Sequence, residues 1–118
     1  MEPSINLAVV LGTCSSPADV RVLPSGQTLV QLQCTTTLDG KGVSVPVAVV
    51  DPPAWVEQLD AGAEILVVGS VRRRFFQAAG ATASRVEIAA ESVARASDRR
   101  RAATARRRID ARLLPLDG

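Results

Sequence analysis

The sequence predicts an all-β protein, a five-stranded barrel with one short helix between its third and fourth strands, followed by a basic C-terminal arm. Short runs that alternate apolar and polar residues recur between glycine and proline turns, which is typical of β-strands. One segment opened by two prolines has helical spacing instead. Near residue 95 the composition changes to alanine and arginine. We therefore divide the chain into a barrel domain, residues 1–94, and an arm, residues 95–118.

The composition predicts a folded protein of the cytoplasm. The chain has 118 residues, enough for one domain, and 47% of them are hydrophobic. No apolar run approaches the roughly 20 residues that a membrane helix needs. The N-terminus also lacks the basic start and apolar middle of a secretion signal. We expect no association with a membrane.

Reactive residue types are scarce, which argues against an enzyme or a metal protein. The sequence has no histidine, so the usual general base and a common metal ligand are missing. Its two cysteines, Cys14 and Cys34, form no C-x-x-C pair. A reactive thiol is one interpretation of either cysteine, but we favour the interpretation that both are small buried residues of strands. We therefore expect no catalytic residue, metal or cofactor.

The first predicted strand spans residues 5–11, where apolar residues alternate along the chain. Its Leu7, Val9 and Leu11 share one face, because successive side chains of a strand point to opposite sides. A short extended piece at residues 20–23 lies between two proline turns and is not counted among the five strands.

The second strand is predicted at residues 28–36 and the third at residues 43–50, joined by an Asp-Gly hairpin turn. Both runs place an apolar residue at every second position. The residues expected to face inward are Val30, Leu32 and Cys34, followed by Val43, Val45, Val47 and Val49.

A short helix is predicted after the third strand. Asp51 is a candidate cap, two prolines occupy the first turn, and Gly62 lies just past the end. Trp55 and Leu59 are four positions apart and therefore share one helix face. We expect Trp55 to pack in the core or to cap the barrel.

The fourth strand, residues 65–76, carries the main functional signal. It begins as an apolar run and ends in three arginines followed by two phenylalanines. Alternation places Val71, Arg73 and Phe75 on one face and Arg72, Arg74 and Phe76 on the other. Guanidinium groups attract a phosphate backbone, and an aromatic ring stacks on a base of any identity. This strand therefore predicts a nucleic-acid surface.

The fifth strand is predicted at residues 82–90. Val86 and Ile88 are expected to face inward, and Arg85 and Glu87 outward. Five short strands must curl or close to protect their edges. A five-stranded barrel with a helix in this position is the OB-fold arrangement, whose open face commonly binds oligonucleotides.

The arm concentrates positive charge. Residues 1–94 carry six basic and nine acidic residues, a net charge of −3, whereas residues 95–118 carry eight arginines against three aspartates, a net charge of +5. We expect a surface arm that is helical only in part, because its apolar residues are small and sparse. A solubilising tail and a protein-docking segment are alternatives, but we favour phosphate binding. The arginines concerned are Arg99, Arg100, Arg101, Arg106, Arg107 and Arg108.

Four segments in order resemble the bacterial single-stranded DNA-binding protein family. They are the glycine, proline turn and Val-Arg pair of residues 12–27, the helix-ending Gly62, the arginine-aromatic run of residues 69–76, and residues 84–93. The resemblance covers roughly residues 5–93. It implies an OB barrel, assembly into homodimers or homotetramers, and sequence-tolerant binding of single-stranded DNA in replication, recombination or repair.

The resemblance also implies site residues. Arg72, Arg74 and Phe76 fall on the DNA-facing side of the family's fourth strand, and Arg21 falls at the arginine of its Val-Arg pair. Arg85 lies on the exposed face of the fifth strand. Three further candidates are weaker, because Arg73 points away and because the two aromatics are expected mainly to pack: Arg73, Phe75 and Trp55.

The sequence departs from the family in ways that support a divergent paralogue. Its second and third strands carry no aromatic residue, and the arginine-rich arm replaces an acidic C-terminal tip. An alternative is therefore an interaction module with weak or no DNA affinity that docks on replication or repair proteins. RNA binding is a weaker alternative.

Overall fold

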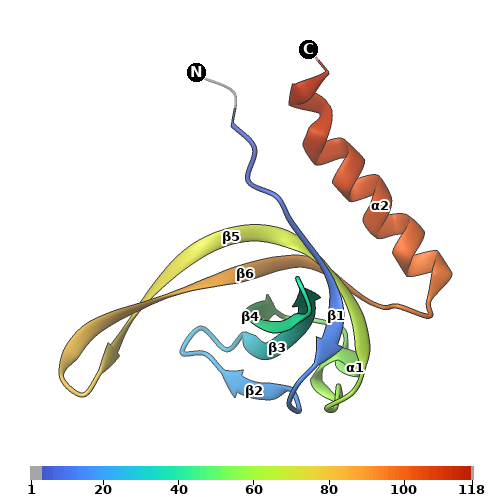
Figure 1. The fold of residues 1–118 in the computed structure, drawn as a ribbon. Coiled ribbons are helices and arrows are strands. Elements are labelled where there is room, and N and C mark those ends of the chain that lie inside the picture. Colours follow the sequence, from blue (N-terminus) through green and yellow to red (C-terminus); the bar gives the residue numbers. More distant parts are fainter. Residues whose placement is uncertain (1–3, 118) are drawn as a thin grey trace.

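The computed structural model describes residues 4–117, which form a β-barrel followed by a long C-terminal helix (Figure 1). The short elements are β2 (Asp19–Val22), α1 (Ala54–Glu57) and a 3₁₀ turn at Leu114–Leu116. The longer elements, in chain order, are β1 (Ala8–Cys14), β3 (Thr28–Leu38), β4 (Lys41–Val50), β5 (Glu64–Ala78), β6 (Ala81–Arg95) and α2 (Arg99–Leu113).

The strands close into a five-stranded mixed barrel of the OB-fold-like kind, as the sequence predicts at this level of detail. The sheet order is β1-β5-β6-β4-β3-β2, and a pairing of β1 with β3 closes the ring. The β4–β6 pairing is parallel, and the other pairings are antiparallel. β2 is attached to the outer edge of β3 and stands outside the closed ring.

Two glycines permit the sharp bends that closure requires. At Gly12, where β1 passes from β5 to β3, an added Cβ would lie 2.5 Å from the carbonyl oxygen of Thr35. At Gly69 an added Cβ would collide with the carbonyl oxygen of Ala89, beside a register shift between Val68 and Gly69. Only a residue without a side chain fits such close backbone approaches.

The short helix departs from the prediction in position, length and cap. It lies between β4 and β5 and not between the third and fourth strands, because β2 pairs with β3 and counts as a strand. It ends at Glu57, well before Gly62, and its N-cap is Pro53. The carboxylate of Asp51 instead accepts a hydrogen bond of 2.8 Å from the backbone N–H of Thr28.

The core confirms the predicted faces of the second and third strands in the closed part of the barrel. Val30, Leu32 and Cys34 are buried, and so are Val47 and Val49. Val43 is 39% exposed, since this part of β4 runs beyond the barrel.

The face of the first strand that carries Val9 and Leu11 is not the one that packs against the core. Val9 and Leu11 are 45% and 64% exposed, and it is Val10 that packs against the core. Val10 stands opposite Val67, whose side chain is fully buried, so the pairing with β5 decides which face of β1 is covered.

The prediction for the last strand is wrong at two of its positions. Ile88 is buried as expected, but Val86 is 48% exposed and Glu87 is 2% exposed. β5 and β6 form a long hairpin that continues past the barrel (Figure 1). Val86 precedes Ile88, the first residue of β6 that pairs with β4, and lies on the part of the hairpin outside the barrel, where no core covers it.

The C-terminal arm is helical throughout residues 99–116, more fully than the sequence predicts. Asp98 caps α2 by accepting a hydrogen bond from the backbone N–H of Arg101. The helix packs on β6 and β5 through Ala105, which is fully buried. Arg112 adds an ion pair to Glu91. Small side chains suffice because they let the helix axis approach the sheet closely. No helix among residues 4–117 is long and apolar enough to cross a membrane.

Candidate nucleic-acid interface

The hairpin of β5 and β6, together with β2 and β3, forms a groove of about 300 Å³ that we call the hairpin groove. Four of the five principal residues predicted from the sequence line it, and the fifth, Arg72, lies on the same face of β5. The lining residues are Arg21, Gln31, Arg74, Phe76, Gln77 and Arg85.

Strand pairing explains why residues distant in sequence meet here. Arg74 stands opposite Arg85 in the hairpin, and residues paired across two strands point to the same side. Alternation then adds Phe76 to that side. Arg21 comes from the neighbouring β2, where it pairs with Leu29 of β3.

A buried carboxylate, Glu87, fixes two of the arginines. Arg72 donates to Glu87 Oε2 from Nη2 at 2.9 Å and from Nε at 3.1 Å. Arg74 Nε lies 3.3 Å from Glu87 Oε1, an ion pair without the angle of a hydrogen bond. The Glu87 side chain is 1% exposed, so these guanidinium groups compensate the cost of burying its charge. The sequence prediction placed Glu87 at the surface and missed this role.

The amide of Gln31 links the remaining arginines, a role that the sequence did not indicate. We assign its orientation from its neighbours. Its oxygen then accepts from Arg74 Nη2 at 2.7 Å and from Arg85 Nη2 at 3.1 Å, and its nitrogen donates to Asp19 Oδ2 at 3.3 Å. Asp19 also pairs with Arg21 at 3.2 Å. The signal in the sequence is only the position of Gln31 between Val30 and Leu32, which were predicted to face inward.

The groove keeps a positive charge and unsatisfied donors. The four arginines at positions 21, 72, 74 and 85 face two carboxylates, Asp19 and Glu87, which leaves a net charge of +2. Among the described residues, the shielded Nε atoms of Arg74 and Arg85 have no hydrogen-bond partner.

Phe76 gives the groove an aromatic wall. Its side chain is 40% exposed, and the guanidinium carbon of Arg74 lies 6.0 Å from the ring centroid. This distance is at the limit of a cation–π contact. The ring is therefore open enough to stack on a planar group.

Arg73 and Phe75 lie on the opposite side of the hairpin, as alternation predicts. Arg73 donates to Ser84 Oγ at 3.0 Å. Phe75 is 66% exposed and does not pack in the core. The expectation that it packs could hold only at an interface between molecules. Val71 and Val86 are also exposed there, at 47% and 48%.

Trp55 is not part of the hairpin groove. It packs against the core, in line with the structural role that we expected. Its ring lies 5.2 Å from the guanidinium carbon of Arg95 and 5.3 Å from that of Arg101. Because Arg101 belongs to α2, Trp55 joins this helix to the end of the barrel.

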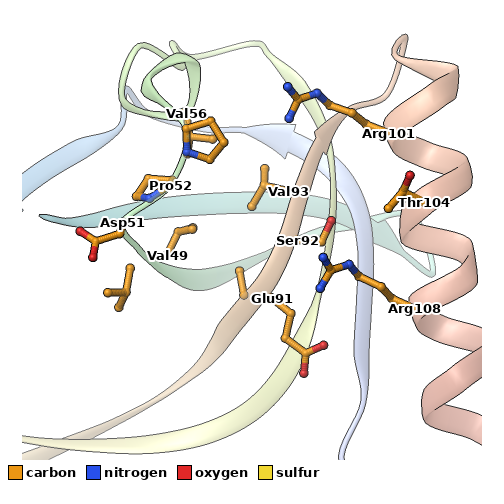
Figure 2. Close-up of a pocket in the computed structure, with 13 residues that line it drawn as sticks. Val49, Asp51, Pro52, Val56, Glu91, Ser92, Val93, Arg101, Thr104 and Arg108 are labelled. Carbon is orange, nitrogen blue, oxygen red and sulfur yellow. The ribbon is translucent and has the colours of Figure 1, made fainter. Parts of the chain in front are cut away.

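A second opening of about 300 Å³, which we call the α2 cleft, lies between the ends of β4 and β6 and the helix α2 (Figure 2). Of the predicted arm arginines, Arg101 and Arg108 line it, together with Thr104. The others are exposed and do not line it: Arg99, Arg100, Arg106 and Arg107.

The cysteines are buried in the closed part of the barrel. Cys14 and Cys34 stand opposite each other on β1 and β3. Burial, and secondarily the neighbouring Cys14, raises the pKa of Cys34 to about 11. Burial also raises the pKa of Cys14. Within residues 4–117 no three His, Cys, Asp or Glu side chains gather in a group that could hold a metal ion.

Comparison of the sequence with protein-family models and with curated proteins finds no match. The fold is an OB-fold-like barrel on the evidence of its topology. The resemblance to bacterial single-stranded DNA-binding proteins stays a prediction.

Proposed function

We propose that the chain binds single-stranded DNA with little sequence preference, in replication, recombination or repair in the bacterial cytoplasm and nucleoid. The observation that carries this proposal is the hairpin groove, where arginines from three strands surround the exposed ring of Phe76. Cationic grooves with aromatic walls bind single strands, because the charges follow the backbone and the ring stacks on a base.

The expected binding is mainly electrostatic. A stacked base contributes about 1–3 kcal/mol, and the groove offers one aromatic residue. Phosphate contacts must therefore supply most of the affinity. For a single strand, the slope of log affinity against log salt is about −0.7 per phosphate contacted, so binding should weaken steeply with salt. RNA remains a weaker alternative, because neither a ring nor a guanidinium group distinguishes the sugars.

The direct test is a titration of fluorescently labelled oligothymidylate at low and high salt. The informative variant is Arg21→Gln/Arg85→Gln, since neither arginine pairs with the buried Glu87. Loss of two phosphate contacts should reduce the salt slope by about 1.4. Arg73→Gln is the control on the other side of the hairpin, and its matched counterpart is the single change Arg85→Gln, since each removes one charge.

The affinities of the double variant and of the control decide whether DNA binds in the hairpin groove. Reduced affinity in the double variant with unchanged affinity in the control supports the hairpin groove. A folded double variant that binds DNA like the unchanged protein would count against the proposal.

A second candidate function, protein–protein interaction, is favoured by the apolar side of the hairpin. Val71, Phe75 and Val86 are all about half exposed or more on that side. We propose that it is an interface, either between copies in a homodimer or homotetramer or with a replication or repair protein. Sedimentation of the protein with and without Phe75→Ser tests self-association. Nuclease-resistant capture of a partner without any DNA retention would favour the interaction module over DNA binding.

A further inference from the structure

The α2 cleft exists because the pairing of β4 with β6 is very short. The two strands share only two register pairs, Val47 with Ile88 and Ala48 with Ala89. Beyond them, the end of β4 and residues 90–93 line opposite sides of the cleft. Two core residues in its lining, Val49 and Val56, are buried, and the apolar side chains accessible in the cleft include Val50, Pro53 and Val93.

Helix α2 places cations at the mouth of this apolar opening. Arg101, Thr104 and Arg108 follow the three- and four-residue spacing of one helix face, and Figure 2 shows both arginine side chains projecting from the helix toward β6. Arg101 pairs with Asp98 at 3.3 Å. Within residues 4–117, Arg108 has no hydrogen-bond or ion-pair partner, so its charge is available.

The carboxylates that line the α2 cleft are already engaged. Glu91 forms an ion pair with Arg112. Asp51 accepts hydrogen bonds from the backbone N–H of Thr28 at 2.8 Å and from Gln27 Nε2 at 3.3 Å. Neither acid neutralises Arg108, and the mouth of the cleft on the helix side favours an anion.

The α2 cleft and the hairpin groove open on the same outer face of the sheet. Val50, in the wall of the cleft, pairs with Leu29, which pairs with Arg21 of the groove. At a strand spacing of about 4.8 Å, two strands separate these residues by roughly 10 Å. Between groove and cleft runs the register row of Gln31, Ala48 and Ala89, in which Ala89 is partly exposed and Ala48 is 3% exposed, so a strand that crosses here passes over small side chains between taller neighbours.

We propose that a DNA strand bound in the hairpin groove continues across this alanine row into the α2 cleft. There Arg108 and Arg101 bind a backbone phosphate, and the apolar lining takes the adjacent base. The inference rests on the proposed function and deepens it, since it makes α2 the second wall of the DNA path. It selects two of the six arm arginines named from the sequence.

The test compares two double variants of the full chain with equal change in charge and equal spacing. Arg101→Gln/Arg108→Gln removes the cations that line the cleft, and Arg99→Gln/Arg106→Gln removes two that do not line it. At about 100° per residue, positions 99 and 101 lie almost opposite on the helix. The single pair Arg108→Gln and Arg106→Gln avoids disturbing the contacts of Arg101 with Asp98 and Trp55.

The probes are oligothymidylates of about 6 and about 16 nucleotides, within the range of site sizes for OB-folds. We expect Arg101→Gln/Arg108→Gln to weaken the longer oligomer about tenfold at low salt and to lower its salt slope by about 1.4. The shorter oligomer, which can occupy the hairpin groove without entering the α2 cleft, should lose less affinity than the longer one. The control variant should lose less than about twofold for either length.

Other results would overturn the inference. Equal losses in both double variants would mean that α2 acts only through its total charge. No loss in either would mean that DNA does not reach the cleft. Absence of binding by the unchanged protein would instead remove the proposed function, together with this extension of it.

Discussion

The hairpin of β5 and β6 and the helix α2 both present arginines, but the two regions hold them differently. In the hairpin, Arg72 and Arg74 are fixed by the buried Glu87, and Gln31 holds Arg74 and Arg85. On α2, Arg99, Arg100 and Arg106 have no such partner among the described residues. Figure 1 shows α2 and the hairpin tip at opposite ends of the molecule. Fixed cations lose little freedom on meeting a ligand, whereas free ones must be ordered first.

The largest expected effect comes from removing the two arginines that compensate Glu87. Arg72→Leu/Arg74→Leu leaves a carboxylate that is 1% exposed without its ion pairs. Stranding a buried charge in this way costs about 3–5 kcal/mol. The matched change Arg99→Leu/Arg106→Leu on α2 should alter stability by less than about 0.5 kcal/mol. Urea unfolding measures both, and similar values would show that the two regions do not differ as described.

The next effect concerns affinity and not stability. Phe76→Leu should reduce the affinity for oligothymidylate by about 1–3 kcal/mol, because the aromatic wall of the groove is lost. This loss should be nearly independent of salt, unlike that of an arginine variant. Phe75→Leu, on the other side of the hairpin, is the control and should bind normally. A loss of equal size in the control would place the stacking surface elsewhere.

A smaller effect is expected where α2 docks. Ala105 is fully buried against the sheet, whereas Ala103 on the same helix is exposed. Ala105→Glu should cost about 1 kcal/mol, because the helix can separate while the barrel stays folded. Hydrogen exchange should then become faster in residues 99–113 but not in the strands. Ala103→Glu should leave exchange unchanged, and protection of α2 in Ala105→Glu would argue against this docking.

An effect of similar size concerns the closed core of the barrel, which lies between the two regions. In the folded state burial raises the pKa of Cys34 from its ordinary 9.0 to about 11. The unfolded thiol therefore ionises first as pH rises, and the free energy of unfolding falls between these two values. By about pH 10 the loss should be about 1 kcal/mol. Urea unfolding at about pH 8 and pH 10 measures it, and Cys34→Ala should remove most of the dependence.

The sequence predicted the barrel strands and the side of β5 that faces the groove because both follow from alternation, whereas Arg21 was named only from the family resemblance. The two-residue period of a strand places Arg72, Arg74 and Phe76 on one side, whatever the position of the hairpin relative to the barrel. Strand pairing then adds Arg85 to that side. The same reasoning was wrong for Val86 and Glu87, because a pattern gives the face of a residue but not whether anything covers that face. β6 begins several residues before its first pairing with β4 at Ile88, so the apolar residues of this early part have no core to enter.

Three other features were beyond prediction for different reasons. The docking of α2 depends on Ala105, and a single alanine carries too little hydrophobic signal to indicate a buried stripe. The α2 cleft depends on where β4 and β6 part, which neither strand's own sequence specifies. The link through Gln31 needs Asp19, Arg74 and Arg85 together, and these meet only after the sheet has formed.

The side chain of Asn6 marks the point where one edge of β5 becomes unpaired, and this open edge bears on the solubility of the hairpin. β1 pairs with β5 as far as Gly69, and Asn6 then bonds both backbone groups of Val71, accepting from the N–H at 2.8 Å and donating to the oxygen at 2.7 Å. Past this point β5 has an open edge, which in many proteins invites pairing with another chain and aggregation. Charged residues blunt such edges, so the arginine run guards the hairpin against self-templated sheet growth besides any part it has in binding.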